Sequence, residues 1–565
     1  MRRPVVALVA SALVAAGCSL PLPHGVRSVG EVPSKEQQSG DVLQVIPPGP
    51  KPGQQPTDIV RGFLGAQANS EHAHRIARSF LTASQAQLWD DTAGVEVLDL
   101  GSRTVEPKPA GGTGEAALSV TAPVTGRIDP DGSYSVRSGT LEEVYRLRKE
   151  GGQWRLSDVP PGLRLTPADR DRSFRPAEVF YPVLTAKAAS PRLAADRVFV
   201  PVAADQAQVL VDRVLAAPTR RLQGTVTFRR GLVAAAVTTD GSGTVTVALA
   251  PAAAALTAAD RAGLSAQLVW TLRQLAPRFR GLRLLVGGRP LRVPGQGEVQ
   301  DAEAWDSYDP EGLGPSPPYY YAANRRLRSS GTLFASDATT GTAGVDGHIA
   351  VDGVAVSPDG AQIALLDGVA PGRVTLRTGT PRGPTYRRAV TGDALRSPSW
   401  GAGDRGLWLL TGHRGLALLP PGGSALQDVP ISGAPAAGRF TALAASRDGT
   451  RVALVIGRRL YVGKVSDAGG RVRVSDLQPL VGVPPVTAVA WVSGTELAVL
   501  AVPFQLLRVA IDGSVVDTVN TAGHVATSLA ASPAGLLLVA QGVIYRLTGR
   551  APVKVANGTA AAYPG

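Results

Sequence analysis

Apolar residues recur at helical spacing in only a few stretches of this chain. These stretches are 58–64, the residues after Ser70, 206–215, and a stripe formed by Leu264, Leu268, Leu272 and Leu275. Most other apolar residues alternate with polar ones or form short uninterrupted runs, and both patterns are typical of β-strands. The clearest predicted strands are 95–98, 117–120, 142–147, 198–202, 244–249 and 281–286. We therefore expect a multidomain protein in which α+β domains precede an all-β region.

The first folded segment begins with helices and continues in strands. Ser70 is a candidate N-cap for the second helix, which would place Ile76 and Phe80 on one face. Residues 150–153 (Glu-Gly-Gly-Gln) are typical of a tight turn before a returning strand. We predict an α+β domain over residues 57–160, with a curved antiparallel sheet that resembles the NTF2-like cone.

A second α+β domain is predicted for residues 173–293. Thr257 to Asp260 form a capping box at the start of the leucine-striped helix. A buried strand follows and ends in the turn Val286-Gly287-Gly288. This helix and strand, with the following Arg289-Pro290-Leu291, resemble the GerMN domain, a small α+β module of bacterial envelope and sporulation proteins.

The C-terminal part of the chain repeats a short turn before an apolar run. The clearest copies are Ser357-Pro358-Asp359-Gly360, Ser446-Arg447-Asp448-Gly449 and Ser532-Pro533-Ala534-Gly535, and weaker ones begin at Trp400 and Trp491. Neighbouring copies lie about 40 to 46 residues apart, the length of a four-stranded blade. Proline fixes φ and glycine accepts a positive φ, so the motif suits a tight turn between two strands. We predict an all-β propeller over residues 320–565, with five or six blades and an irregular first blade.

The N-terminus has the pattern of an exported lipoprotein. Arg2 and Arg3 precede an uncharged run from Val5 to Ala16, shorter than the roughly 20 residues that span a bilayer. Ala15-Ala16-Gly17-Cys18 resembles the lipobox of bacterial lipoproteins, and Cys18 is the only cysteine. We expect residues 1–17 to be a signal peptide and Cys18 to carry an S-diacylglycerol and an N-acyl group such as palmitate. These acyl chains would anchor the protein in the lipid bilayer, on the extracytoplasmic face of the cell membrane. An ordinary secretory signal with an incidental cysteine is the alternative.

Residues 18–56 are rich in proline, with eight prolines from Pro21 to Pro56. Such a composition favours an extended, semi-rigid chain over a packed one. We predict a stalk that holds the first domain away from the membrane. No later run approaches roughly 18 uncharged apolar residues, so we expect the remainder to stay outside the bilayer.

The formal net charge is +13, mostly from arginines spread along the chain. A nucleic-acid-binding protein would concentrate this charge and interleave it with aromatic residues. No such cluster is visible, so we expect no nucleic acid partner. Attraction to anionic lipid headgroups or wall polymers is one interpretation of the charge, and a bias in codon composition is the other.

We find no motif of an active site, a metal site or a cofactor site. The chain lacks a Gly-x-x-x-x-Gly-Lys phosphate loop, a Gly-x-Gly-x-x-Gly after a strand, and a Gly-x-Ser-x-Gly nucleophile elbow. Gly241-Ser242-Gly243 is explained better as a hairpin turn. His72 and His74 would point to different faces of a helix and are expected to be solvated. We therefore expect no enzymatic activity, no metal and no cofactor.

Two acidic pairs and a tyrosine run are the remaining candidates. Asp90-Asp91 at a predicted helix end, and Glu142-Glu143 on a predicted strand, could supply catalytic carboxylates, although ordinary solvated positions explain both. Tyr319-Tyr320-Tyr321 lies between the second domain and the propeller. It could form an exposed contact surface, or it could pack the linker against the propeller.

The order of these segments, from lipobox to propeller, resembles the actinobacterial LpqB lipoproteins. Further likeness lies in residues 56–64 (Pro-Thr-Asp-Ile-Val-Arg-Gly-Phe-Leu) and 80–82 (Phe-Leu-Thr). The resemblance implies a non-enzymatic accessory that binds the extracytoplasmic domain of the sensor kinase MtrB and modulates the MtrAB two-component system. The alternative is an envelope protein that binds a small ligand in the N-terminal cone, or a cell-wall polymer. A hydrolase is a third and weaker alternative.

Overall fold

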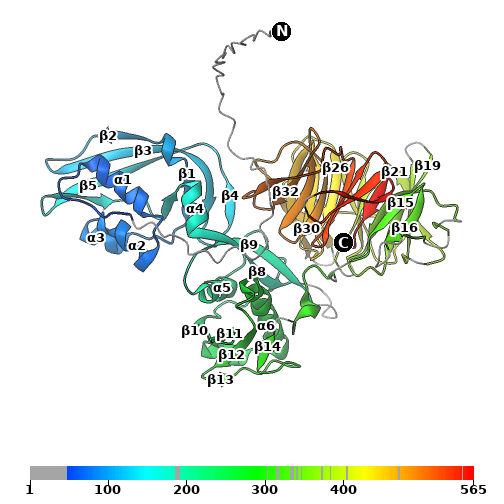
Figure 1. The fold of residues 1–565 in the computed structure, drawn as a ribbon, viewed down its shortest axis with the longest axis horizontal. Helices are drawn as coiled ribbons and strands as arrows, with labels where there is room; N and C mark the ends of the chain where they lie inside the picture. The colour runs from blue at the N-terminus through cyan, green and yellow to red at the C-terminus, as the bar shows by residue number, and fades with distance from the viewer. Residues whose placement is uncertain are drawn as a thin grey trace, which may run out of the picture.

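The computed structural model describes residues 47–184, 191–301, 303–313, 317–330, 336–338, 342–344, 347–370, 373–381, 383–402, 405–468, 471–549 and 551–565 (Figure 1). The predicted signal peptide, Cys18 and most of the predicted stalk lie outside these ranges. Three units follow one another: an N-terminal unit (56–173), a GerMN-like unit (174–301) and a propeller (320–565). Within the described ranges, no helix has the length and apolar character needed to cross a membrane.

In the N-terminal unit the first and third helices pack against a sheet, and the second helix packs on the first (Figure 1). The first helix begins at Pro56, where Gln55 and Asp58 form a capping box. Ser70 precedes the second helix as predicted, although its hydroxyl makes no capping hydrogen bond. The helices are α1 (Pro56–Ala66), α2 (Glu71–Ser79), α3 (Ala83–Leu88) and, after the sheet, α4 (Pro167–Ser173). The strands are β1 (Val95–Leu98), β2 (Thr104–Lys108), β3 (Glu115–Ile128), β4 (Tyr134–Val136), β5 (Thr140–Glu150), β6 (Gln153–Asp158) and β7 (Leu163–Leu165), ordered β6-β5-β3-β1-β7 with β2 and β4 also on β3.

The space between these helices and the sheet is filled by aromatic side chains. Phe63 packs edge-on against Trp89 and Tyr145, with ring centroids 5.2 Å and 6.4 Å apart. All three side chains are buried. These rings form part of the hydrophobic core of the unit.

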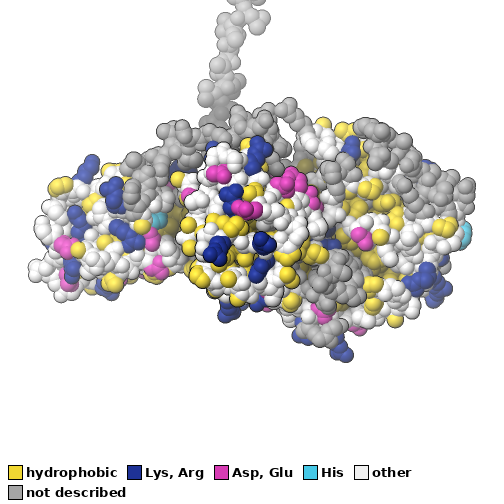
Figure 2. Space-filling model, turned by 90° about the horizontal axis from the view of Figure 1, so that it is seen from below, with side chains coloured by type: hydrophobic (Ala, Val, Ile, Leu, Met, Phe, Trp, Pro, Cys, Tyr) yellow, Lys and Arg dark blue, Asp and Glu magenta, His cyan; other side chains and the backbone are white. Residues whose placement is uncertain are grey.

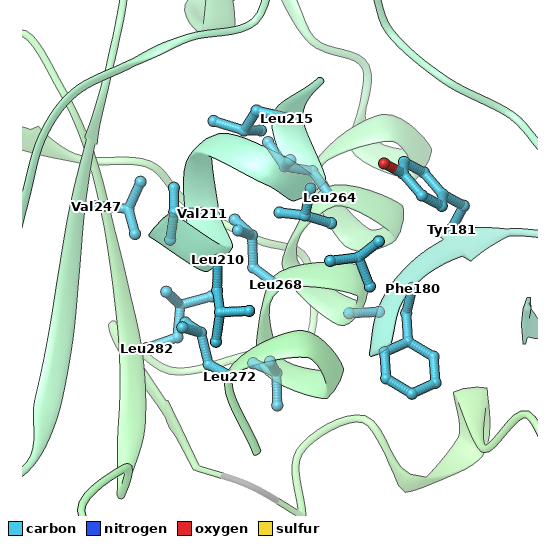
Figure 3. Packing of buried hydrophobic residues seen from close by; sticks show 14 of the residues in the cluster. Phe180, Tyr181, Leu210, Val211, Leu215, Val247, Leu264, Leu268, Leu272 and Leu282 are labelled. Carbon is cyan, nitrogen blue, oxygen red and sulfur yellow. The ribbon is translucent and has the colours of Figure 1, made fainter. Parts of the chain in front are cut away.

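In the GerMN-like unit, α5 (Gln206–Leu215) and α6 (Ala258–Leu272) pack on a sheet and on each other. The predicted capping box is confirmed, because Thr257 and Asp260 exchange side-chain hydrogen bonds with each other's backbone N–H. Leucines of the predicted stripe point from α6 toward α5 and the sheet, and close the core (Figure 3). The strands are β10 (Ala234–Thr239), β11 (Thr244–Leu249), β12 (Gly281–Val286), β13 (Arg289–Pro290) and β14 (Val299–Asp301), with β11 and β12 parallel. A separate hairpin joins β8 (Phe174–Pro182) to β9 (Leu193–Pro201).

The all-β propeller that we predicted is confirmed: among the described residues it contains six sheets of four antiparallel strands. The first sheet combines β15 (Tyr320–Ala323), β16 (Arg326–Ser330) and β17 (Ser336–Ala338) with β38 (Ala560–Ala562) from the C-terminus. This pairing closes the ring, because the first and last strands of the region share one blade. The second and third sheets are β18 (Val351–Val356), β19 (Ile363–Ala370), β20 (Arg373–Gly379) and β21 (Arg387–Asp393), and β22 (Arg396–Trp400), β23 (Leu407–Thr411), β24 (Gly415–Leu419) and β25 (Gln427–Asp428). The fourth sheet contains β26 (Phe440–Ala445), β27 (Arg451–Ile456), β28 (Arg459–Ala468) and β29 (Arg471–Pro479). The fifth contains β30 (Val486–Ser493), β31 (Glu496–Ala501), β32 (Gln505–Ala510) and β33 (Val516–Val519). The sixth contains β34 (Ser528–Ser532), β35 (Gly535–Ala540), β36 (Val543–Leu547) and β37 (Val553–Asn557).

The repeated turns join neighbouring strands of single blades, as predicted. The turn at Asp359-Gly360 connects β18 to β19, and the turn at Asp448-Gly449 connects β26 to β27. Gly360 and Gly449 have φ values of +69° and +75°. The motif is therefore explained by turn geometry, since L side chains rarely adopt this backbone conformation.

Candidate functional site

The β8–β9 hairpin connects the GerMN-like unit to the propeller (Figure 1). Arg451 Nη2 of the propeller donates to the carbonyl of Ala195 in β9 at 2.6 Å. Arg197 Nε lies 3.1 Å from the carboxylate of Asp512, whose side chain is fully buried. Arg451 and Asp512 are buried, Arg197 is half-buried, and each has a partner, so the contacts fix the hairpin on the propeller. Two further hydrogen bonds run from Arg192 to the carbonyl of Arg447 and from Thr495 to Glu178.

Arg447, in the turn between β26 and β27, lies at the centre of the propeller on this face. Its side chain is 2% exposed and donates to the carbonyls of Pro564 at 3.1 Å, Trp491 at 3.2 Å and Ala531 at 2.5 Å. These carbonyls lie on or beside β38, β30 and β34, which belong to three other blades. The blades of β26 and β38 are opposite each other in the ring of described sheets, so Arg447 reaches across the propeller axis.

Glu311 connects Arg447 to the segment before the propeller. Its carboxylate lies 3.3 Å from Arg447 Nη1 and accepts the backbone N–H of Gly494 at 2.7 Å. Burial raises the pKa of the Glu311 carboxyl, against the opposing attraction of Arg447, and burial lowers the pKa of Arg447. Removal of either ion would leave the other buried without its counterion. The centre of the propeller at this face is therefore occupied by the chain's own ion pair.

The candidate residue His74 lies away from this interface, in the N-terminal unit. Its Nε2 is 3.8 Å from Asp91, which also pairs with Arg78 at 3.0 Å, and its ring packs near Trp89. Burial lowers the pKa of His74. Our expectation of a solvated histidine is wrong at this position, because Trp89 and Asp91 cover the ring. The side chain of His72 lies outside the described part of the chain.

The two acidic pairs have structural roles. Glu143 forms an ion pair with Arg164, whose side chain is 7% exposed, so the expected solvated position is wrong for Glu143. Glu142 pairs with Lys108 at 3.3 Å, and it is exposed as expected. Asp90 accepts hydrogen bonds from the backbone and the hydroxyl of Thr92. Among the described contacts, none of these carboxylates bonds to Arg447 or Glu311.

Two further expectations concern turns and linkers. Residues 241–243 form the hairpin turn between β10 and β11, as predicted. Tyr320 and Tyr321 belong to β15, and Tyr319 packs edge-on against Tyr563 with ring centroids 5.9 Å apart. The tyrosine run therefore begins the propeller and is not a linker. Within the residues that the structure covers, no group of three or more His, Cys, Asp or Glu side chains could hold a metal ion.

Sequence reasoning missed Arg447 and Glu311. One signal was available: Arg447 replaces the proline found at the same position of the other turns, Pro358 and Pro533. A charged residue in a turn that otherwise repeats Ser-Pro indicates a contact outside that turn. Nothing in the local sequence marks Glu311, because its partner lies in a distant segment.

Comparisons with known proteins match the chain in three consecutive parts. Residues 49–171 match the family described as "Lipoprotein LpqB, N-terminal domain", and residues 332–564 match "Lipoprotein LpqB beta-propeller domain". Between them, residues 179–292 match "Sporulation and spore germination", the Germane module, which confirms the resemblance to GerMN. The two matches specific to LpqB therefore flank the GerMN-like unit.

Relatives named lipoprotein LpqB align over most of the chain. Lipoprotein LpqB of Streptomyces coelicolor is 28% identical, over 100% of this chain and 98% of the relative. Lipoprotein LpqB of Thermobifida fusca is 28% identical over 86% of each chain, and that of Cutibacterium acnes is 27% identical over 93% and 91%. The resemblance drawn from the sequence is thus confirmed, and the chain belongs to the family of LpqB lipoproteins.

Proposed function

We propose that this lipoprotein is anchored through acylated Cys18 at the extracytoplasmic face of the cell membrane, where it binds and modulates a sensor kinase of the MtrAB type. The kinase partner comes from the family resemblance. The protein acts without catalysis: it presents a protein-binding surface built from the propeller and the GerMN-like unit. A lipid anchor confines both proteins to one membrane, which raises their effective concentration.

The docking of β8–β9 on the propeller is the observation that best supports this proposal. Buried polar contacts hold the two units together, so they present one continuous surface to a partner. The centre of the propeller on that face is filled by Arg447 and Glu311. A binding role at the outer surface fits this arrangement better than a reaction at the propeller axis.

Binding of an anionic cell-wall polymer is the second candidate, and the charge of the GerMN-like unit favours it. Residues 173–293 contain sixteen Lys and Arg but only six Asp and Glu, a net charge of +10 out of +13 for the whole chain. The positive charge is thus more concentrated than the spread of arginines along the chain indicated. Figure 2 shows several patches of Lys and Arg at the centre of the view, where this unit lies nearest.

A pull-down from actinobacterial membranes separates the two candidates. The acylated protein is used as bait, beside the same protein without residues 320–565 and a charge-reduced form, Arg289→Gln with Arg292→Gln. We expect the full chain to retain the sensor kinase and the truncated chain to lose it, with no change for the charge-reduced form. Retention of wall material in place of the kinase, weakened in the charge-reduced form, would contradict the kinase proposal and support the second candidate.

A further inference from the structure

A cavity of about 560 Å³ lies where the three units meet. The N-terminal unit lines it with residues 129–137 around the β3–β4 hairpin, and the GerMN-like unit with Arg220 and Arg221. The propeller contributes Arg451 of β27, residues of β28 and β29, the residues that follow β29, and Ile511 and Asp512 after β32. Its volume falls within the range of small-molecule sites, about 300–1,000 Å³.

Each acidic side chain in the cavity wall already has a cationic partner. Asp129 accepts from Arg127 at 2.5 Å, and Asp476 lies 2.6 Å from Lys464. Asp512 is 3.1 Å from Arg197. The carboxylates of the wall are therefore neutralised by these neighbours and leave Arg137, Arg220 and Arg221 without a carboxylate partner.

Three arginines of the wall have no carboxylate partner. Arg137 and Arg220 are exposed, and their side chains make no hydrogen bond or ion pair within the described residues. Arg221 donates one hydrogen bond to the carbonyl of Tyr134, but its buried Nη1 has no partner among the described atoms. Arg451, which is buried in the same wall and pairs with Asp448 at 3.4 Å, has an Nε without a partner there. The wall thus carries surplus positive charge and unused donors.

The rest of the wall is partly apolar, through Val136, Val462, Leu480, Val481 and Ile511. Guanidinium groups bind phosphate and carboxylate oxygens through paired N–H donors, and an unpaired buried donor is costly. We propose that this three-unit cavity binds the phosphate or carboxylate group of a small anionic ligand, whose apolar portion contacts the valine and leucine side chains. The phosphate could belong to a soluble compound or to a lipid headgroup. This inference is independent of the kinase proposal.

Calorimetric titration of the mature chain with Cys18→Ser tests the site, with sn-glycerol 3-phosphate as the probe and glycerol as the uncharged control. The key variant is Arg137→Gln with Arg220→Gln, which removes charge but no contact among the described residues. We expect the dissociation constant for glycerol phosphate to rise about tenfold or more in this variant. The matched control, Arg289→Gln with Arg292→Gln, removes two exposed arginines of the GerMN-like unit that lie outside the cavity and should leave binding unchanged.

Vesicles distinguish the two sources of the anion. If the ligand is a lipid headgroup, phosphatidylglycerol in phosphatidylcholine vesicles should bind the same chain, compete with glycerol phosphate and lose affinity with Arg137→Gln and Arg220→Gln. If the ligand is a soluble compound, only the binding of glycerol phosphate should be weakened by Arg137→Gln with Arg220→Gln. The proposal is overturned if neither probe binds at concentrations on the order of 10 mM, or if both arginine pairs weaken binding equally, which would indicate attraction to the overall charge.

Discussion

Replacement of Arg447 by methionine tests whether the propeller is held together across its axis. The substitution keeps apolar volume but removes four interactions of a buried guanidinium: the carbonyls of Pro564, Trp491 and Ala531, and the carboxylate of Glu311. The three carbonyls and the carboxylate would then stay buried without this donor.

The expected loss of stability follows from the buried ion pair. Breaking such a pair by removal of one partner costs about 3–5 kcal/mol. For a domain of this size, a change of 1 kcal/mol moves the midpoint of thermal unfolding by roughly 2–4 °C, so we expect a decrease of roughly 6–20 °C for the propeller. Because the chain has several units, hydrogen exchange of amides in β26, β30 and β34 should be measured alongside calorimetry.

Two further variants complete the experiment. Arg458→Met changes an exposed arginine of the same blade and should alter stability little. Glu311→Gln, alone and combined with Arg447→Met, measures the coupling between the two charges, which we expect to be about 1 kcal/mol or more. A cost of Arg447→Met no larger than that of Arg458→Met, or strict additivity with Glu311→Gln, would refute the role assigned to this ion pair.

Three other predictions concern the anchor, a turn and a histidine. Cys18→Ala should leave unprocessed precursor or release the protein from membranes, as seen by fractionation and mass spectrometry; normal processing with membrane retention would contradict the lipobox. Gly360→Val should destabilise the propeller by about 1 kcal/mol or more, because φ at this position is +69°. The control is Gly241→Val, since Gly241 has no positive φ and no neighbouring atom within 4 Å. It should lower the free energy of unfolding by less in the same denaturation assay. Burial lowers the pKa of His74 from 6.5. Below about pH 6.5 the unfolded chain therefore binds more protons than the folded one, and the free energy of unfolding should decrease as the pH is lowered. His74→Gln should make this decrease smaller; an unchanged pH dependence of the free energy of unfolding would show that the histidine is not its cause.

Local patterns predicted the elements that form from local interactions. The helix 206–215 and the strands 244–249 and 281–286 have the predicted limits, since apolar periodicity and flanking caps or glycines define them. The strand β8 was missed: Pro176 and Pro182 interrupt its pattern, and its extended form depends on pairing with β9. The first blade looked irregular for a related reason, because β38 joins it from the far end of the chain.

The interface could not be predicted because its contacts are not local. Arg447 and Glu311 are separated by 136 residues, and the sequence around neither residue identifies the other as its partner. The burial of His74 and Glu143 also depends on partners that fold against them from other elements. The sequence therefore predicted the fold class and the family, but not which charged residues become buried between units.

Phosphorylation of the response regulator is the most direct test of the proposed function. It should be measured in the native host with four strains: one with the full-length protein, one with Cys18→Ala, one lacking residues 320–565, and a deletion strain. We expect the phosphorylation level with the full-length protein to differ from that of the deletion strain. The other two forms should resemble the deletion strain, because Cys18→Ala removes the anchor and the truncation removes the binding surface. Equal phosphorylation in all four strains would contradict the signalling role.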